Sequence, residues 1–114
     1  MATRVPETNS EADQVLSVSW AAIATGDTVQ ESMPRGVSGA MASVQSDGTF
    51  DGATVTLEGS NDGKNFVTLR DLSGADISFA SAGLVDFSTS VVFIRPAISG
   101  GSADAVDVTL ALRG

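Results

Sequence analysis

A predicted β-hairpin at residues 58–69 constrains the fold of this chain more than any other feature. Residues 53–58 alternate between apolar and polar side chains, which is the two-residue period of a strand with one buried face. Residues 61–63, an Asn-Asp-Gly sequence, tolerate the positive φ angles of a tight reversal. The apolar pattern resumes at Phe66 and Leu69. The hairpin therefore predicts an antiparallel sheet, and no catalytic group is needed to explain it.

The same two-residue period predicts further strands. Residues 15–22 and 106–112 alternate clearly, and a short strand within 39–45 places either Ala42 or Met41 on its buried face. Glycine-rich turns separate these segments, and none of them has the period of a helix. Seven or eight short strands predict an all-β fold, an antiparallel β-sandwich, with a small barrel as the competing arrangement.

Two segments give more specific predictions. Residues 91–94 are an apolar run before Arg95, which predicts a strand buried on both faces that stops pairing at Pro96. Residues 47–52 contain two Asp-Gly pairs and predict a loop. The predicted core consists of Trp20, Val55, Leu57, Phe66, Leu69, Phe79, Phe93, Val108 and Leu110.

The chain is predicted to have a flexible N-terminal arm, residues 1–14, and a β-sandwich domain, residues 15–114. The arm contains Pro6 and four charged residues but no apolar periodicity, so it is not expected to pack by itself. A chain of 114 residues has room for one domain with an independent core. Residues 1–19 lack the basic start and apolar centre of a signal peptide, so we expect a chain that is made and used in soluble form.

Composition argues against several functions. Fourteen acidic and six basic residues give a net charge of −8, which repels phosphate and argues against nucleic acid and anionic membrane as partners. The chain has no histidine and no cysteine, and therefore lacks the usual general base and the thiolate metal ligands. We therefore expect no enzymatic activity and no catalytic, cofactor-binding or metal-ligating site.

Five residues are predicted to contact a partner: Arg4, Met33, Pro34, Arg35 and Arg95. Arg4 is the one cationic side chain of the predicted arm. Met33 precedes Pro34 and Arg35 in a predicted loop, where it either contacts a partner or packs against the core edge. Arg95 ends an apolar strand, and its guanidinium can bind a partner's carboxylate or an acid of this domain; we favour the internal pair.

Three stretches resemble small β-sandwich proteins encoded in the structural gene clusters of tailed bacteriophages. They are GATVTLEGSNDGKNF at 52–66, FIRPAISGG at 93–101 and VTL at 108–110, and the similarity spans about 20–112. The resemblance implies a capsid decoration or cement protein, made in the host cytoplasm and located on the outer capsid surface of the virion. Such proteins stabilise the shell by bridging subunits of the major capsid protein, often as homotrimers.

The sequence SNDGKNF at residues 60–66 also resembles a hairpin of discoidin-type carbohydrate-binding sandwiches, in which a Trp commonly occupies the position of Phe66. This resemblance implies a carbohydrate-binding module as the alternative function. A cement protein needs an extended polar footprint and gains from an arm that orders on docking, whereas a carbohydrate-binding module needs a groove with aromatic faces. An aromatic content of 5% and the predicted arm favour the capsid protein.

Overall fold

The computed structural model describes residues 2–12, 15–33 and 41–113. These residues form an all-β fold, as predicted, with eleven strands rather than seven or eight. The strands are β1 (Thr3–Arg4), β2 (Glu7–Ala12), β3 (Val15–Ile23), β4 (Thr28–Val29), β5 (Met41–Thr49), β6 (Thr54–Ser60), β7 (Val67–Thr68), β8 (Ser78–Phe79), β9 (Gly83–Phe87), β10 (Phe93–Ser99) and β11 (Ala105–Arg113). The described ranges contain no helix long and apolar enough to cross a membrane.

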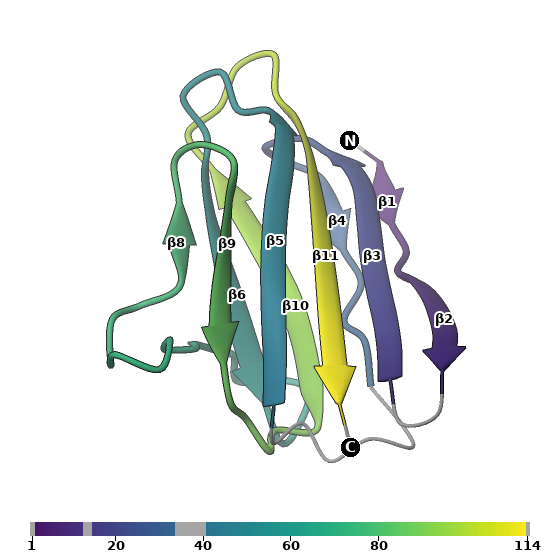
Figure 1. The fold of residues 1–114 in the computed structure, drawn as a ribbon. Coiled ribbons are helices and arrows are strands. Elements are labelled where there is room, and N and C mark those ends of the chain that lie inside the picture. Colours follow the sequence, from purple (N-terminus) through teal and green to yellow (C-terminus); the bar gives the residue numbers. More distant parts are fainter. Residues whose placement is uncertain (1, 13–14, 34–40, 114) are drawn as a thin grey trace.

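The strands form two layers (Figure 1). One layer is a five-stranded antiparallel sheet with the order β2-β3-β11-β5-β9. The second layer is a smaller antiparallel sheet in which β6 pairs with β10 on one edge and with β7 and β8 on the other. The predicted hairpin is therefore confirmed as β6 and β7, with Glu58 opposite Thr68 and Gly59 opposite Val67.

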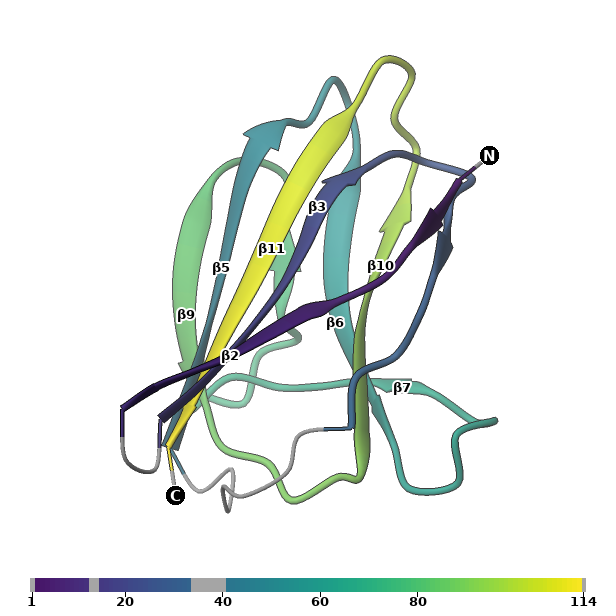
Figure 2. The ribbon, with the colours of Figure 1, turned by 90° about the vertical axis from the view of Figure 1, so that its right-hand side faces the viewer.

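A third, two-stranded sheet connects the layers along one side. β1 pairs in parallel with β4, and the chain after β4 reaches β10 through two backbone hydrogen bonds between Ser32 and Ile94, of 2.8 and 2.9 Å. Figure 2 shows the N-terminal chain passing from β1, which lies beside β4, to β2 on the five-stranded sheet. One side of the sandwich is therefore partly closed, as it is in a barrel.

The N-terminal residues correct the prediction that ordered structure begins near Val15. Paired chain starts at Thr3, because β1 pairs with β4 and β2 pairs with β3. The polar sequence of β2 lacks apolar alternation, but the hydrogen bonds of a sheet join backbone groups and do not depend on that pattern. An outermost strand can therefore form from residues that sequence periodicity assigns to an arm.

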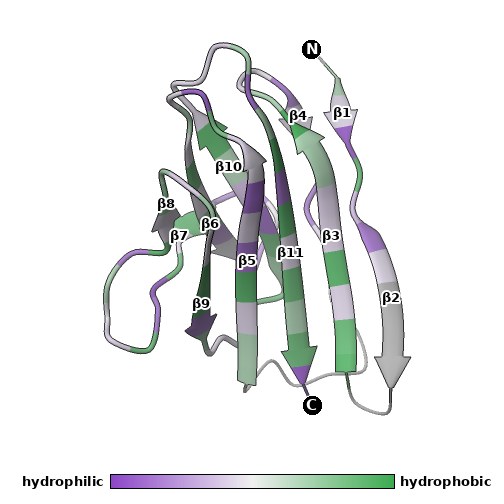
Figure 3. Ribbon diagram, turned by 45° about the horizontal axis from the view of Figure 1, so that its top comes forward, coloured by the Kyte–Doolittle hydropathy of each residue, from purple (hydrophilic) through white to green (hydrophobic). Residues whose placement is uncertain are grey.

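The core lies between the layers and confirms most of the predicted residues. Trp20 is fully buried, and its indole Nε1 donates a hydrogen bond of 2.8 Å to the Gln30 carbonyl. Figure 3 shows the alternation of hydropathy along β3 that turns one face inward. Val55, Leu57, Phe79, Val108 and Leu110 are also buried as predicted. Leu69, Phe66 and Phe93 are only half-buried.

The apolar run before Arg95 is not buried on both faces. In β10, Ile94 and Pro96 are buried, whereas Phe93 and Arg95 lie on the opposite, half-buried face. The prediction was wrong because β10 is an edge strand of the smaller sheet, and no helix or strand of the described ranges pairs with or stacks on its outer face. The apolar run therefore places an aromatic ring on the surface.

Pro96 does not end the pairing of β10, which continues to Ser99 with Pro96 opposite Leu57. The Ile94 N–H points away from β6, since it donates to Ser32. Backbone direction repeats every two residues in a strand, so the Pro96 nitrogen also points away from β6. The missing N–H therefore removes no hydrogen bond of the β6 ladder, as is usual for an edge-strand proline.

The predicted loop at residues 47–52 begins later than expected, because β5 extends through Asp47 and Gly48 to Thr49. Gly48 has φ +106° and a Cβ there would lie 2.5 Å from the Ala105 carbonyl oxygen, so this end of the ladder requires glycine. The sequence left open whether Ala42 or Met41 lies on the buried face of this strand. In the structure Ala42 is buried and Met41 is exposed.

Candidate partner-binding surfaces

The hairpin loop between β6 and β7 is held by the carboxylate of Asp62. This carboxylate accepts hydrogen bonds from the backbone N–H groups of Lys64 (2.8 Å) and Asn65 (2.9 Å), from the Asn65 amide (2.7 Å) and from the Ser60 hydroxyl (2.8 Å). These donors, the backbone N–H groups first, hold the pKa of Asp62 well below its usual range. The Ser-Asn-Asp-Gly-Lys-Asn sequence therefore has a structural role, and it makes the hairpin a rigid projection.

Beside this hairpin, three side chains form a cluster on the outer face of the smaller sheet. Arg95 and Glu58 are directly opposite each other in β10 and β6, with 3.1 Å between Nε and Oε1. The Arg95 guanidinium carbon also lies 3.7 Å from the centre of the Phe66 ring, a cation–π contact. The predicted internal pair of Arg95 is confirmed.

Phe66 corrects the predicted core, because its ring lies under Arg95 on the outer face. The arginine covers part of the ring, so the ring does not have to enter the core to lose contact with water.

On the inner face at the end of β6, Gly59 leaves space for other side chains. A Cβ at Gly59 would lie 2.8 Å from Val91 Cγ2 and 2.9 Å from Leu69 Cδ2.

A cleft of about 290 Å³ separates β4 from the outer edge of β10. It is lined by Asp27, Thr28, Val29, Glu58, Arg95, Pro96, Ala97 and Ile98. Asp27 is held by Arg4 of β1, with 2.8 Å between Arg4 Nε and Asp27 Oδ2. Hydrogen bonds from Arg4 and from the Ala24 and Ala2 N–H groups hold the pKa of Asp27 well below its usual range.

The predicted contact residues are thus brought together only in part. Arg95 lines the β4–β10 cleft, and Arg4 is paired with Asp27, another residue of its lining; Arg95 is paired with Glu58. Met33 follows the Ser32 bridge to β10, and 41% of its surface is exposed. Pro34 and Arg35 lie outside the described residues.

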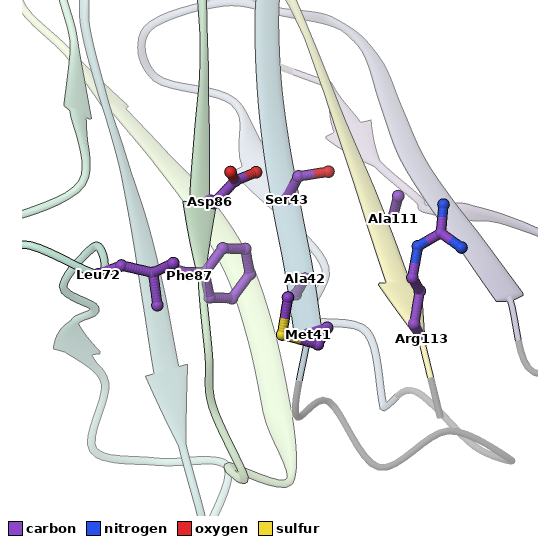
Figure 4. A pocket seen from close by; sticks show the side chains of 8 residues that line it. All are labelled: Met41, Ala42, Ser43, Leu72, Asp86, Phe87, Ala111 and Arg113. Carbon is purple, nitrogen blue, oxygen red and sulfur yellow. The ribbon is translucent and has the colours of Figure 1, made fainter.

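A second cleft, of about 230 Å³, was not predicted from the sequence (Figure 4). It lies around β5, β9 and the C-terminal end of β11, and its lining residues are Met41, Ala42, Ser43, Leu72, Asp86, Phe87, Ala111 and Arg113. Met41 and Leu72 are 61% and 65% exposed. Alternation in β5 predicts that Met41 and Ser43 share a face, but only the pairing of strands shows that Asp86 and Arg113 lie on either side of them.

The second cleft adjoins an uncharged area on the outer face of the five-stranded sheet. The strand registers place small or polar residues side by side there, namely Ser17, Ser19, Ser43, Gln45, Thr109 and Ala111. Side chains of this size make a low surface that lets another molecule approach the sheet closely. Among the described residues, no group of three or more acidic side chains is placed to hold a metal ion.

The fold and these surfaces define a small antiparallel β-sandwich whose charged, aromatic and cleft-lining residues lie on its outer faces. The crystal structure of the SPBc2 prophage-derived protein YomS has the same fold. The TM-score is 0.65 over 91% of this chain and 99% of that chain, with 10% sequence identity. At this identity the similarity shows the fold alone.

Two further solved structures are much less similar. One is Drosophila melanogaster CENP-C bound to CAL1, with a TM-score of 0.34, 8% identity and coverage of 93% of this chain and 69% of that chain. The other is from the Bacillus endospore appendages, which form disulfide-linked pili, with a TM-score of 0.34, 12% identity and coverage of 96% and 89%. Neither similarity is high enough to carry an argument. No protein-family model and no curated protein sequence matches the chain.

Proposed function

We propose that this protein is a structural component of a tailed-bacteriophage virion that binds the outer surface of the capsid. In this role it stabilises the shell by bridging subunits of the major capsid protein. The observation that carries the proposal is the fold shared with a prophage-derived protein, which extends over nearly the full length of both chains. The three stretches that resemble phage β-sandwich proteins support the same role, since they form β6, the hairpin, β10 and the centre of β11.

We assign the capsid contact to the outer face of the smaller sheet, where Arg95, Glu58 and Phe66 adjoin the β4–β10 cleft. A guanidinium has five N–H donors, and within the described residues Arg95 uses only Nε, toward Glu58. Its terminal nitrogens can therefore bind a carboxylate of the shell while the internal pair remains. The stacking on Phe66 fixes the guanidinium in advance, which lowers the entropy lost on binding.

The proposal includes self-association as a homotrimer on the capsid. A chain with a net charge of −8 gains no long-range attraction to an acidic shell, so local contacts and repeated sites have to provide the affinity. Association of several copies with repeated sites raises modest individual affinities by roughly 10²–10⁴. Binding that depends on such contacts should persist at high salt.

The experiment is cosedimentation of the purified protein with capsids stripped of decoration proteins, at low and at high salt. The proposal expects saturable binding that tolerates salt and weakens in the Arg95→Gln variant. The matched control is Arg70→Gln, because Arg70 is exposed and makes a loose ion pair of 3.8 Å with Asp76 outside the proposed surface. Absence of saturable binding, or equal losses in both variants, would contradict the proposal.

The carbohydrate-binding alternative is tested in parallel on a polysaccharide array. One face of Phe66 is already covered by Arg95, so a stacked sugar has only the other face unless the arginine is displaced. Selective glycan binding without affinity for capsids would favour the alternative and reject the capsid role.

A further inference from the structure

Asp86 and Arg113 are charged residues that have no counter-charge within the described part of the chain. Both are exposed, and they lie on opposite walls of the second cleft, Asp86 on β9 and Arg113 on β11 (Figure 4). By contrast, Arg4, Arg70 and Arg95 each have an acidic partner. A cleft with one acid and one base, both unpaired, has the charge complementarity needed to meet a second copy of itself.

The strand registers fix where these two charges lie on the sheet. Asp86, Ser43 and Ala111 form one row across β9, β5 and β11. Met41 and Arg113 form the next row on the same face, two residues along. Neighbouring strands are about 4.8 Å apart and two residues span about 7 Å. Asp86 and Arg113 are therefore placed symmetrically about β5 and displaced by one repeat along it.

We propose that a second copy of this chain packs on this face about a two-fold axis that runs along β5. Such a rotation exchanges the two sides of β5, so β9 of each copy lies over β11 of the other. Asp86 of one copy then faces Ala111 of the second copy, about 7 Å along the strand from that copy's Arg113. An arginine side chain spans this distance, and the symmetry forms two identical Asp86–Arg113 pairs.

The residues near the proposed axis suit a contact between identical sheets around Met41 and Ser43, because the acidic residues Asp47 and Asp107 lie farther along β5 and β11, about 14 Å from the row of Ser43. Ser43 and Ala111 are small, which allows the two faces to approach to about the 10 Å of packed sheets. Met41 lies on the axis strand and is 61% exposed, so it meets its own counterpart and buries apolar surface in both copies. Leu84, 65% exposed on β9, faces Thr109 of the second copy.

This inference goes beyond the proposed function, because a two-fold contact differs from the three-fold association proposed on the capsid. It can join copies that belong to neighbouring trimers. It requires no capsid, so its test in solution can fail or succeed independently of capsid binding.

Cysteine crosslinking tests the axis, since the chain has no cysteine of its own. Met41→Cys places one thiol on the axis strand, and Val67→Cys is the matched control, 69% exposed on the β6–β7 hairpin. Under mild oxidation at equal concentration, Met41→Cys is expected to form covalent dimers at least ten times faster than Val67→Cys. Equal rates for the two variants would overturn the proposal.

Charge reversal tests the paired contacts in the Met41→Cys background. Arg113→Glu and Asp86→Arg should each slow crosslinking several-fold, because each places like charges opposite one another in both pairs. The double variant restores opposite charges and should recover most of the original rate. If the double variant crosslinks as slowly as the single ones, the predicted pairing is wrong. Circular dichroism of each variant confirms that the fold is retained.

Discussion

The two outer faces of this sandwich use their charged residues differently. On the smaller sheet, Arg95 is paired with Glu58 and stacked on Phe66, so the cluster is satisfied within one chain. On the five-stranded sheet, the centre is uncharged, and Asp86 and Arg113 have no partner among the described residues. One face is therefore a fixed polar and aromatic projection, whereas the other is a low surface with unused charges at its border.

The difference shows why exposure or charge alone does not identify a binding surface. An internal ion pair orients its residues before a partner arrives, and it keeps spare donors for that partner. An unpaired acid and base on one face instead gain most when a second molecule supplies the opposite charges. We therefore assign the first face to a large partner, the capsid, and the second face to another copy of the chain.

Both faces lie on one shared core, and removal of its largest buried side chain should have the largest effect on stability. Trp20→Ala removes a fully buried indole between the sheets and should lower the free energy of unfolding by about 3–5 kcal/mol. Leu84→Ala, on the exposed outer face of β9, is the control and should change it little. Urea denaturation followed by circular dichroism measures both. Similar small losses in the two variants would contradict a shared core.

A smaller loss is expected at Phe66, because its ring is half-buried under Arg95 rather than in the core. Phe66→Ala should lower the free energy of unfolding by about 1–2 kcal/mol, the sum of partial burial and the cation–π contact. The same urea measurement applies. A loss of about 3–5 kcal/mol would instead show that Phe66 belongs to the core.

A double-mutant cycle compares the charged pairs of the two faces directly. Glu58→Gln and Arg95→Gln should show a coupling energy of about 0.2–1 kcal/mol, since both side chains are partly exposed. The corresponding cycle for Asp86 and Arg113, measured at a concentration where the protein is monomeric, should show no coupling. Coupling of similar size at Asp86 and Arg113 would mean that these residues already interact within one chain.

The effect of pH on the stability of the fold should be smallest near neutrality and larger in acid. The pKa values of Asp27, Asp62 and Asp71 are lowered by hydrogen bonds in the folded protein. Their carboxylates therefore stabilise the fold above the ordinary value of 3.8, and this stabilisation is lost as pH falls from about 4 toward the lowered values. Thermal unfolding should show a falling midpoint below pH 4, with a weaker fall in Asp62→Asn. Midpoints that stay constant from pH 5 to 2.5 would contradict this.

The sequence predicted the elements that alternate strongly and missed those that do not. β3, β6 and β11 have regular apolar and polar alternation, and each is found where it was expected. β1 and β2 have no such pattern. They form nonetheless, because the pairing of an edge strand depends on backbone hydrogen bonds rather than on burial of its side chains. The apolar residues of β10 were overinterpreted, since a run of this kind does not show which neighbours cover it.

Parts of the candidate surfaces could be predicted only where the sequence around a single residue indicated its contact. Arg95 comes directly after an apolar run in the sequence, which predicts that its guanidinium pairs with an acid of the same domain, and it pairs with Glu58. Arg4 was placed in a flexible arm, although it lies on β1 and pairs with Asp27 next to β4. The second cleft combines β5, β9 and β11, and the positions of Asp86 and Arg113 follow from strand order, which local sequence does not encode.

The most direct test of the different roles of the two faces is a cryo-EM map of capsids decorated with this protein. Our account predicts density for the sandwich on the outside of the shell, with Arg95 and the β6–β7 hairpin directed toward the major capsid protein. It also predicts that the β5–β9–β11 face is turned away from the shell, toward solvent or another copy. A map in which the five-stranded sheet lies on the shell, or in which capsids remain undecorated, would contradict it.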